Sequence, residues 1–431
     1  MQYYSLNKKA PNVSFKDAVI NGLAPDKGLY FPENSTPLDK DFFDHIEYFT
    51  DQEIAYEVIR QFVADDIPET ALKQIIEETL NFNFPVVHIE ENIAVLELFH
   101  GPTMAFKDVG ARFMARCLGY FNNQKSTRKV TVLVATSGDT GGAVASGFLG
   151  VEGVDVVILY PSGKVSHVQE KQLTTLGQNI TALEVDGSFD DCQDMVKSAF
   201  LDEDLIQKMN LTSANSINVA RWLPQMFYFF YTFKQLKNKE KELVFSVPSG
   251  NFGNICAGLM ALKLGLPVKH FIAATNINDV VPNYLETLVY TPKLSKQTIS
   301  NAMDVGNPSN FIRILEIFAH DNQKLKKYLS SYSFTDDDTR EAIKLIKENS
   351  NYIADPHGAV GYLGLKKYVL DKNIQGIFLE TAHPVKFLDV VEPIIKETLK
   401  LPQQILDVID KEKIAMNIST YDELKHFLLT R

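Results

Sequence analysis

The stretch VLELFHGPTMAFKD (residues 95–108) decides the fold, because it contains a buried strand, a Gly-Pro turn and a lysine at the start of a helix. Open α/β sheets place their ligands at the carboxyl ends of strands, which is where Lys107 would lie. The helix dipole and burial both disfavour an ammonium charge, so the pattern favours a neutral amine that can form a Schiff base. A single lysine is nevertheless most often a solvated surface charge. Two further segments, 250–254 and 381–387, therefore decide between a reactive lysine and a surface lysine.

From Ile93 onward, apolar strands alternate with helical stretches. This alternation predicts right-handed crossovers and an α/β fold with open, mostly parallel sheets. The expected strands are 94–99, 130–135, 154–160, 180–185, 243–247, 268–274 and 376–379. The acidic run after Thr335 predicts the capped start of a further helix.

The amino-terminal part differs from the rest of the chain. Apolar residues recur at helical spacing over 37–63 and 69–80, and residues 21–32 form a turn-rich loop with aromatic side chains. A chain of 431 residues is too long for one compact core. We therefore expect an amino-terminal helical domain over 1–92 and a catalytic domain over 93–431.

Composition narrows the class of protein. Hydrophobic residues make up 45% and charged residues 23%, as in ordinary globular proteins, and the net charge of −11 argues against general nucleic-acid binding. No apolar run has transmembrane length, and residues 1–9 lack the apolar core of a signal peptide. Cys117, Cys192 and Cys256 are far apart, which predicts reduced core residues in a cytoplasmic protein. The histidines form no HExxH pattern, so we expect no metal site.

Two glycine-rich turns each follow an expected strand and open an expected helix. They are VATSGDTGGA (134–143) and VPSGNFGNI (247–255). Small residues there let backbone N–H groups approach an anion, and the helix dipole adds attraction. Neither turn has the spacing of a P-loop or of a dinucleotide fingerprint. Together with the Lys107 turn, three strand ends could hold a phosphate, a carboxylate and a reactive amine.

Several long segments resemble those of the threonine synthase family. HGPTMAFKD (100–108) is similar to its cofactor-lysine segment, SGDTG (137–141) to its substrate turn, SGNFGN (249–254) to its cofactor-phosphate cradle and TAHPVKF (381–387) to its carboxyl-terminal cofactor segment. Further similar segments are 21–32, 211–218, 271–276 and 300–304, so the resemblance covers nearly the whole chain.

The resemblance implies a fold-type II pyridoxal phosphate enzyme, similar to the tryptophan synthase β subunit. The implied reaction converts O-phospho-L-homoserine and water into L-threonine and phosphate, as the last step of threonine biosynthesis. Lys107 would carry pyridoxal 5'-phosphate and act as the catalytic proton carrier. Thr381 would hydrogen-bond the pyridine nitrogen. The implied phosphate cradle consists of Gly250, Asn251, Phe252, Gly253 and Asn254.

The resemblance also implies two substrate subsites. The substrate carboxylate would lie on the turn of Ser137, Gly138, Asp139 and Thr140. The substrate phosphate would contact Asn215, Ser216 and Arg221, because a guanidinium group suits phosphate. The alternative for Arg221 is a surface ion pair.

Substrate-directed motifs cluster within 130–220, and cofactor-directed motifs lie outside this span. We therefore expect residues 130–220 to form a smaller subdomain that closes over the cofactor when substrate binds. The charged stretches 125–129 and 238–242 are interpreted as linkers and hinge neighbours.

Some assignments stay open at this point. Asp139 lies in a turn expected to receive a carboxylate, and like charges repel. Asp108 is as consistent with a helix-start charge as with a catalytic group. His100 is consistent with a residue that only packs beside the turn. Two other functions remain alternatives: an amino-acid dehydratase of the same fold type, or a relative that binds the cofactor without catalysis. We expect a monomer or a small homo-oligomer.

Overall fold

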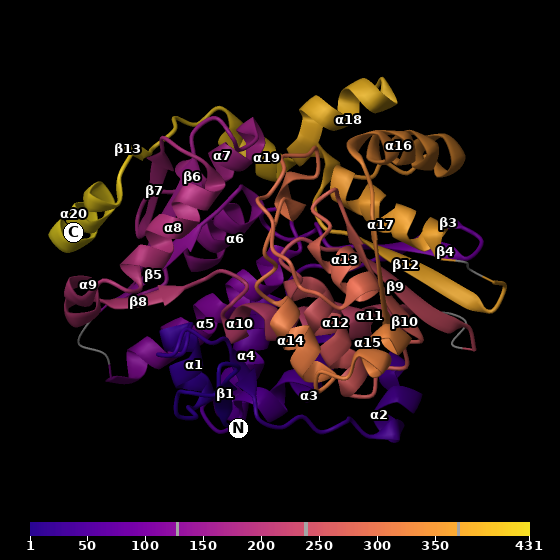
Figure 1. Ribbon diagram of the computed structural model, residues 1–431, viewed down its shortest axis with the longest axis horizontal. Coiled ribbons are helices and arrows are strands. Elements are labelled where there is room, and N and C mark those ends of the chain that lie inside the picture. Colours follow the sequence, from indigo (N-terminus) through magenta and orange to yellow (C-terminus); the bar gives the residue numbers. More distant parts are fainter. Residues whose placement is uncertain (126–128, 237–239, 369–370) are drawn as a thin grey trace.

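The computed structural model describes residues 1–125, 129–236, 240–368 and 371–431. Its two main sheets stand side by side, and the amino-terminal residues lie beneath both (Figure 1). The expected linkers 125–129 and 238–242 fall partly outside the described residues, which omit 126–128 and 237–239.

The larger sheet carries the lysine turn and the second glycine-rich turn. Its strand order is β11 (Leu329–Ser333), β10 (His270–Thr275), β9 (Glu242–Pro248), β12 (Ile374–Glu380), β4 (Ile93–Glu97) and β3 (Val86–Glu90). Its neighbouring strands are parallel except β3 and β4, which form an antiparallel pair. Phe378 of β12 lies opposite both Ser246 of β9 and Val95 of β4, so these three strands end at one edge.

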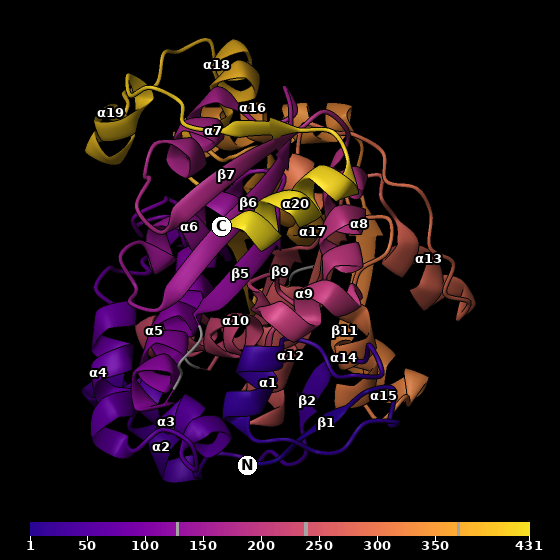
Figure 2. The ribbon, with the colours of Figure 1, turned by 90° about the vertical axis from the view of Figure 1, so that its left-hand side faces the viewer.

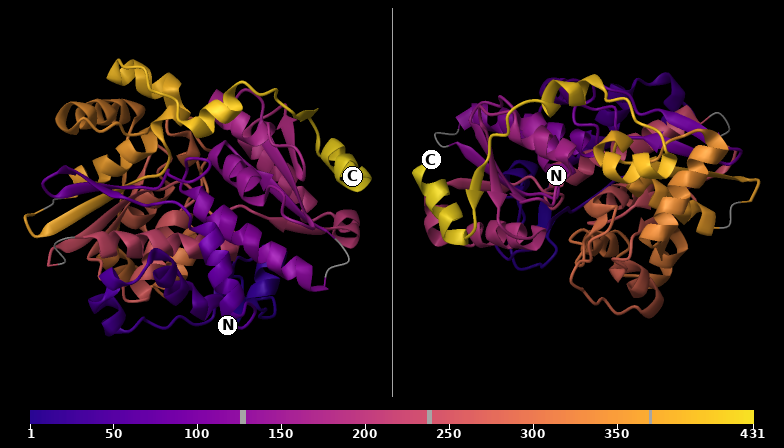
Figure 3. Two further views of the ribbon diagram at one scale, coloured as in Figure 1. Left: turned by 180° about the vertical axis from the view of Figure 1, so that it is seen from behind. Right: turned by 90° about the horizontal axis from the view of Figure 1, so that it is seen from above.

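The smaller sheet carries the first glycine-rich turn. Its order is β13 (Met416–Ile418), β7 (Ile180–Val185), β6 (Val154–Pro161), β5 (Val130–Ala135) and β8 (Asn210–Ser213), with parallel neighbours. The strand β13 comes from the end of the chain, and the last helix lies beside the helices on one face of this sheet (Figure 2). Seen from above, the carboxyl-terminal segment passes from the larger sheet to the smaller one (Figure 3).

Helices surround the two sheets. The amino-terminal ones are α1 (Phe15–Asn21), α2 (Lys40–Asp44), η1 (Ile46–Tyr48), α3 (Asp51–Val63) and α4 (Glu69–Thr79), beside the short antiparallel pair β1 (Tyr3–Ser5) and β2 (Tyr30–Pro32). Those packed with the smaller sheet are α6 (Asp139–Phe148), α7 (His167–Thr174), α8 (Phe189–Ala199), α9 (Glu203–Lys208) and α20 (Tyr421–Thr430). The central ones are α5 (Lys107–Lys125), α10 (Val219–Trp222), η2 (Leu223–Met226), α11 (Phe227–Gln235) and α12 (Gly253–Lys263).

The remaining helices belong to the second half of the chain. They are α13 (Val280–Thr287), η3 (Asn301–Met303), α14 (Phe311–Ile317), α15 (Asn322–Tyr328), α16 (Asp336–Ser350), α17 (Pro356–Lys367), η4 (Pro384–Phe387), α18 (Leu388–Ile395) and α19 (Gln403–Ile409). The expected cap is confirmed: the Thr335 hydroxyl accepts a hydrogen bond from the Asp338 N–H, and the Asp338 carboxylate accepts one from the Thr335 N–H.

The expected strands and the mostly parallel α/β fold are confirmed. The prediction of one helical stretch over 37–63 is wrong. Thr50 and Glu53 form a capping box that starts α3 afresh, after Phe49 has adopted an extended conformation. The short strands β3, β8, β11 and β13 were not expected, because polar residues interrupt their apolar pattern. The domain division at residue 92 stays a prediction.

Candidate active site

The ends of the parallel strands open into a cavity of about 390 Å³. The sequence-predicted residues that line it are Lys107, Ser137, Asp139, Thr140, Asn215, Ser216, Arg221, Gly250, Asn251, Phe252, Gly253, Asn254 and Thr381. Gly138 does not line it, but precedes α6 and donates its N–H to Thr136 Oγ1 at 3.0 Å. The structure therefore brings together segments from both sheets that are far apart in sequence.

Lys107 is the first residue of α5, as predicted. The preceding turn is fixed by Asp108, whose carboxylate accepts hydrogen bonds from the N–H and the hydroxyl of Thr103 at 2.9 and 2.6 Å. Phe106 donates its N–H to the Thr381 carbonyl at 2.9 Å, so the lysine turn and the carboxyl-terminal segment are joined directly. Asp108 is thus a turn-forming residue.

The amine of Lys107 lies in surroundings that favour its neutral form. Burial lowers its pKa to about 8; the Asp139 carboxylate opposes this effect, whereas the Arg221 and Lys386 charges add to it. A pKa near 8 leaves a useful fraction of neutral amine at physiological pH. The expectation of a reactive rather than a solvated lysine agrees with this placement.

The second glycine-rich turn forms a narrow loop at the start of α12. Phe252 adopts a left-handed conformation (φ 61°) just before that helix. A Cβ atom on Gly250 would lie 2.7 Å from the Cα of Met303, so only glycine lets segment 300–304 pack this closely. Asn254 accepts a hydrogen bond from the Tyr228 hydroxyl, and its buried Nδ2 has no partner among the described residues.

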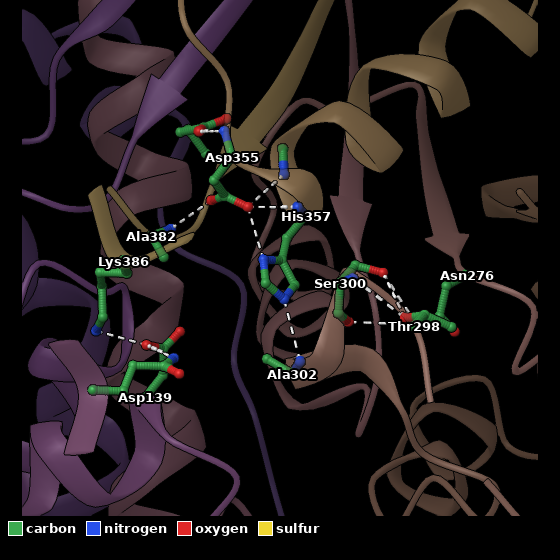
Figure 4. Close-up of polar contacts among 12 residues, drawn as sticks. Asp139, Asn276, Thr298, Ser300, Ala302, Asp355, His357, Ala382 and Lys386 are labelled. Atoms are coloured by element: carbon green, nitrogen blue, oxygen red, sulfur yellow. Dashed lines mark hydrogen bonds and ion pairs between the residues drawn. The ribbon is translucent and has the colours of Figure 1, made fainter. Parts of the chain in front are cut away.

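Asp139 is neutralised by a lysine that the sequence reasoning missed. Lys386 Nζ lies 2.6 Å from Asp139 Oδ1, and both side chains are buried (Figure 4). Gln169 Nε2 donates to the same oxygen at 2.8 Å. Burial alone would raise the pKa of Asp139, but the Lys386 and Lys107 charges outweigh it and hold that pKa well below its ordinary range. The repulsion expected between Asp139 and a bound carboxylate is thereby offset.

The predicted phosphate-directed residues line the same cavity as the second turn, and Ser216 contacts that turn directly. Arg221 is 2% exposed, so the surface alternative is wrong. It donates from Nη1 to the Ala214 carbonyl, and its buried Nε has no partner within the described part of the chain. Ser216 Oγ accepts a hydrogen bond from Asn251 Nδ2 at 2.8 Å, whereas Asn215 Nδ2 donates to the Ala135 carbonyl at 3.0 Å.

Arg221 is placed beside Lys107 by a close helix crossing. Gly110, one turn into α5, lies against the Arg221 carbonyl, and a side chain at Gly110 would meet that oxygen. Burial lowers the pKa of Arg221 to about 10, so the guanidinium stays positively charged at neutral pH. A cationic donor with a free buried N–H is a site for an anion.

Other residues missed by the sequence reasoning support the site from outside it. Arg313 is fully buried and donates to the carbonyls of Tyr30, Ser216 and Ile217 at 3.0, 3.1 and 2.5 Å. The amino-terminal loop is therefore connected to the Ser216 segment. An isolated Arg or Lys residue gives no sequence signal that shows which distant residue it will contact. For Lys386, the one indication was its position inside the cofactor segment 381–387.

His100 lies apart from the cavity. Its Nε2 is 2.7 Å from Glu97 Oε2, and its side chain is 38% exposed. Its ring packs against Phe99 with centroids 4.7 Å apart. Packing, the simpler of the two readings, accounts for this residue.

The donor set fits a phosphorylated aldehyde cofactor. The Lys107 amine, whose pKa is lowered, shares its cavity with a glycine turn at a helix start, where a side chain at Gly250 would collide with Met303. Asn254 lies on that turn, and its Nδ2 has no partner among the residues that the structure describes. Among the described residues, no group of three His, Cys, Asp or Glu side chains could hold a metal ion.

The fold and the cavity define a pyridoxal-phosphate dependent enzyme of fold-type II. Residues 84–377 match the family described as "Pyridoxal-phosphate dependent enzyme", residues 2–80 match "Threonine synthase N terminus", and residues 358–427 match "Threonine synthase, C-terminal". The chain belongs to the threonine synthase family.

Individual threonine synthases are similar to this chain over its full length. The threonine synthase of Buchnera aphidicola subsp. Baizongia pistaciae is 44% identical over 434 residues, covering 100% of both chains. The crystal structure of threonine synthase from Escherichia coli superposes with a TM-score of 0.94 at 42% identity, covering 100% of each chain. A PLP-bound threonine synthase structure from Brucella melitensis gives a TM-score of 0.92 at 33% identity, covering 99% of this chain and 98% of that one. The expected family, fold class, activity and cofactor are confirmed.

The buried pair leads to a prediction about Lys107. Asp139→Asn should lower the pKa of Lys107, because an attractive negative charge is lost, and Lys386→Met should raise it, because a repulsive positive charge is lost. The two changes should be coupled by about 1–3 kcal/mol in the free energy of unfolding. The pH dependence of pyridoxal phosphate uptake by the cofactor-free variants measures the first effect. Shifts in the same direction for both variants would contradict the assignment.

Proposed function

We propose that this cavity converts O-phospho-L-homoserine and water into L-threonine and phosphate, with pyridoxal phosphate attached to Lys107. One observation supports the assignment of roles: Lys107, the glycine turn of Gly250 to Asn254 and Arg221, whose Nε has no partner among the described residues, line one cavity. A neutral amine, a phosphate cradle and a second anion site are what this reaction requires.

The cofactor contacts follow from the larger sheet. The backbone of Gly250 to Asn254 binds the cofactor phosphate without a protein charge. Thr381, at the end of β12, hydrogen-bonds the ring nitrogen, and a hydroxyl does not keep that nitrogen protonated as a carboxylate would. When bound, pyridoxal phosphate supplies a ring that withdraws electrons and stabilises negative charge on substrate carbons.

The substrate contacts follow mainly from the smaller sheet. The turn of Ser137 to Thr140 binds the substrate carboxylate, and Lys386 balances the charge of Asp139 beneath it. Arg221, with Asn215 and Ser216, holds the phosphate that leaves Cγ. Lys107 then moves protons between substrate carbons, and water supplies the hydroxyl that ends on Cβ.

Phosphate release is the direct test of this function. The purified protein should release inorganic phosphate from O-phospho-L-homoserine and form threonine in equal amount. Serine and threonine serve as control substrates for a dehydratase, which would form ammonia and a keto acid instead. Turnover of the controls without phosphate release from phosphohomoserine would contradict the proposal.

We also propose a closure motion for residues 130–220. Its support is that the turn of Ser137 to Thr140 and Asn215 follow strands β5 and β8 of the smaller sheet, while the cofactor-directed residues follow strands of the larger sheet. A substrate anion that bridges the two sheets favours the closed form, because it binds that form more tightly. Closure excludes stray water from reactive intermediates.

Hydrogen exchange tests the closure. A phosphonate analogue of the substrate should slow exchange across 130–220, in addition to the Lys107 and Gly250 turns. The cofactor-loaded protein without the analogue is the reference. Protection confined to the cofactor turns would refute the closure.

A further proposal concerns the cellular compartment, the partners and the oligomeric state of the protein. Among the described residues, no helix is long and apolar enough to cross a membrane. The three cysteines are buried and unbridged. With the acidic net charge of −11, these cysteines support a cytoplasmic enzyme without a nucleic-acid partner, as a monomer or a small homo-oligomer.

A further inference from the structure

Asp355 and His357 connect two segments that line the cavity, the one that contains Ala302 and the one that contains Thr381 and Ala382 (Figure 4). Asp355 precedes α17, and its Oδ1 lies 2.7 Å from His357 Nδ1. Its other carboxylate oxygen accepts the Ala382 N–H at 3.1 Å, and Ala382 directly follows Thr381. One carboxylate thus holds both the imidazole and the backbone of the expected ring-nitrogen segment.

The hydrogen bonds assign the tautomer of His357. Its Nε2 accepts the N–H of Ala302 at 3.2 Å. An accepting Nε2 has no proton, so the proton of the neutral ring is on Nδ1 and is donated to Asp355. The ring is buried and packs against Phe387 with centroids 5.0 Å apart, which fixes its plane.

Ala302 belongs to the segment that covers the phosphate turn. It lies in η3, and the carbonyl of Ala302 and the Cα of Met303 would be 2.9 and 2.7 Å from a Cβ atom on Gly250. Any shift of η3 therefore changes the space above Gly250. His357 supplies a side-chain hydrogen bond to the backbone of η3 at this point.

The side chain that orients His357 is that of Asp355, and a second carboxyl group lies beside it. The neighbouring Glu380 is fully buried and accepts the Asp355 N–H. Burial, followed by repulsion from Asp355, raises the pKa of Glu380 well above its ordinary value. Glu380 therefore favours its neutral form, and the carboxyl group that contacts His357 Nδ1 is that of Asp355.

We propose that His357, oriented by Asp355, is a positioning residue that holds Ala302 over Gly250 and so keeps the phosphate turn and the Thr381 segment in register for the cofactor. The proposal rests on the proposed cofactor site. It assigns His357 no contact with the substrate. The function depends on an acceptor at the position of Nε2, and not on the imidazole as such.

Two variants of His357 separate this role from simple packing. His357→Gln keeps an acceptor oxygen at the position of Nε2, whereas His357→Asn is one carbon shorter and does not reach the Ala302 N–H. The dissociation constant of pyridoxal phosphate, measured on cofactor-free protein by fluorescence titration, should rise about tenfold in His357→Asn, equivalent to about 1.4 kcal/mol. In His357→Gln it should rise less than about threefold.

Controls make the outcome decisive. His320, an exposed residue paired with Glu316, gives the control variant His320→Gln, which should bind the cofactor as the parent does. The melting temperature of each cofactor-free variant reports general destabilisation. Equal losses of affinity in the Gln and Asn variants, or no loss in either, would overturn the proposal.

Failure of this inference is distinguishable from failure of the proposed function. Borohydride labelling of the parent protein shows whether the cofactor is on Lys107. Label on Lys107 with unchanged affinity in His357→Asn would overturn the role of His357 alone. Label elsewhere would overturn the cofactor site itself, and the positioning role with it.

Discussion

Replacing Lys107 by alanine should reduce threonine formation by more than roughly 10⁴-fold. Lys107 both attaches the cofactor and moves protons, and proton transfer by a positioned group alone contributes about 10²–10⁴-fold. The protein should still bind some pyridoxal phosphate through the turn of Gly250 to Asn254, which the substitution leaves intact. Steady-state kinetics and a cofactor titration on the same preparation measure the two effects.

A second lysine provides the matched control. Lys293 lines the same cavity, but its side chain is half exposed and pairs with Asp279 at 2.8 Å. Lys293→Ala removes only an exposed ion pair, so turnover should change by less than about threefold. Substantial turnover in Lys107→Ala, or equal losses in both variants, would show that another group carries the cofactor.

Replacing Arg221 by alanine should lower kcat/KM for O-phospho-L-homoserine roughly 30-fold to 5,000-fold. This corresponds to a loss of about 2–5 kcal/mol in the free energy that stabilises the transition state. The reason is the loss of a charge-assisted contact to phosphate in a buried site, where the Nε of Arg221 has no partner among the residues that the structure describes. Arg221→Lys should recover only part of the activity, because an ammonium group lacks the planar fork of donors.

The Arg221 experiment needs a control for folding, since the side chain is 2% exposed. Cofactor affinity and melting temperature provide it, because the phosphate turn of Gly250 to Asn254 lies on a different element. Near-normal kinetics for Arg221→Ala would show that the leaving phosphate is held elsewhere. An equal loss of cofactor affinity would show that Arg221 contacts the cofactor instead of the substrate.

The parts of the fold that follow from local pattern were predictable. The strands β5 and β7 have the bounds that apolar runs indicated, and Lys107 begins α5 because a Gly-Pro turn ends the preceding strand. The antiparallel strand β3 was not predictable, because its half-exposed VVHIE sequence gives a weak signal without its partner β4.

The groups that tune the site were less predictable than the groups that form it. Lys386 contacts Asp139 only because η4 and the start of α6, which are far apart in the sequence, pack against each other in the fold. His357 contacts Ala302 because η3 and the start of α17, which are also separated in the sequence, pack together. A sequence shows residue types and local spacing, but the partner of a buried charge is set by tertiary packing. The structure shows that Lys386 and Gln169 contact Asp139, and these contacts could not be predicted from the sequence of its own turn.

Reductive labelling of the cofactor lysine tests the central claim most directly. Borohydride fixes pyridoxal phosphate permanently on the amine that carries it, and peptide mapping then identifies the residue. The account predicts label on Lys107, in the peptide that contains Phe106 and Asp108. Label on Lys386, on Lys293 or on any other lysine would contradict it.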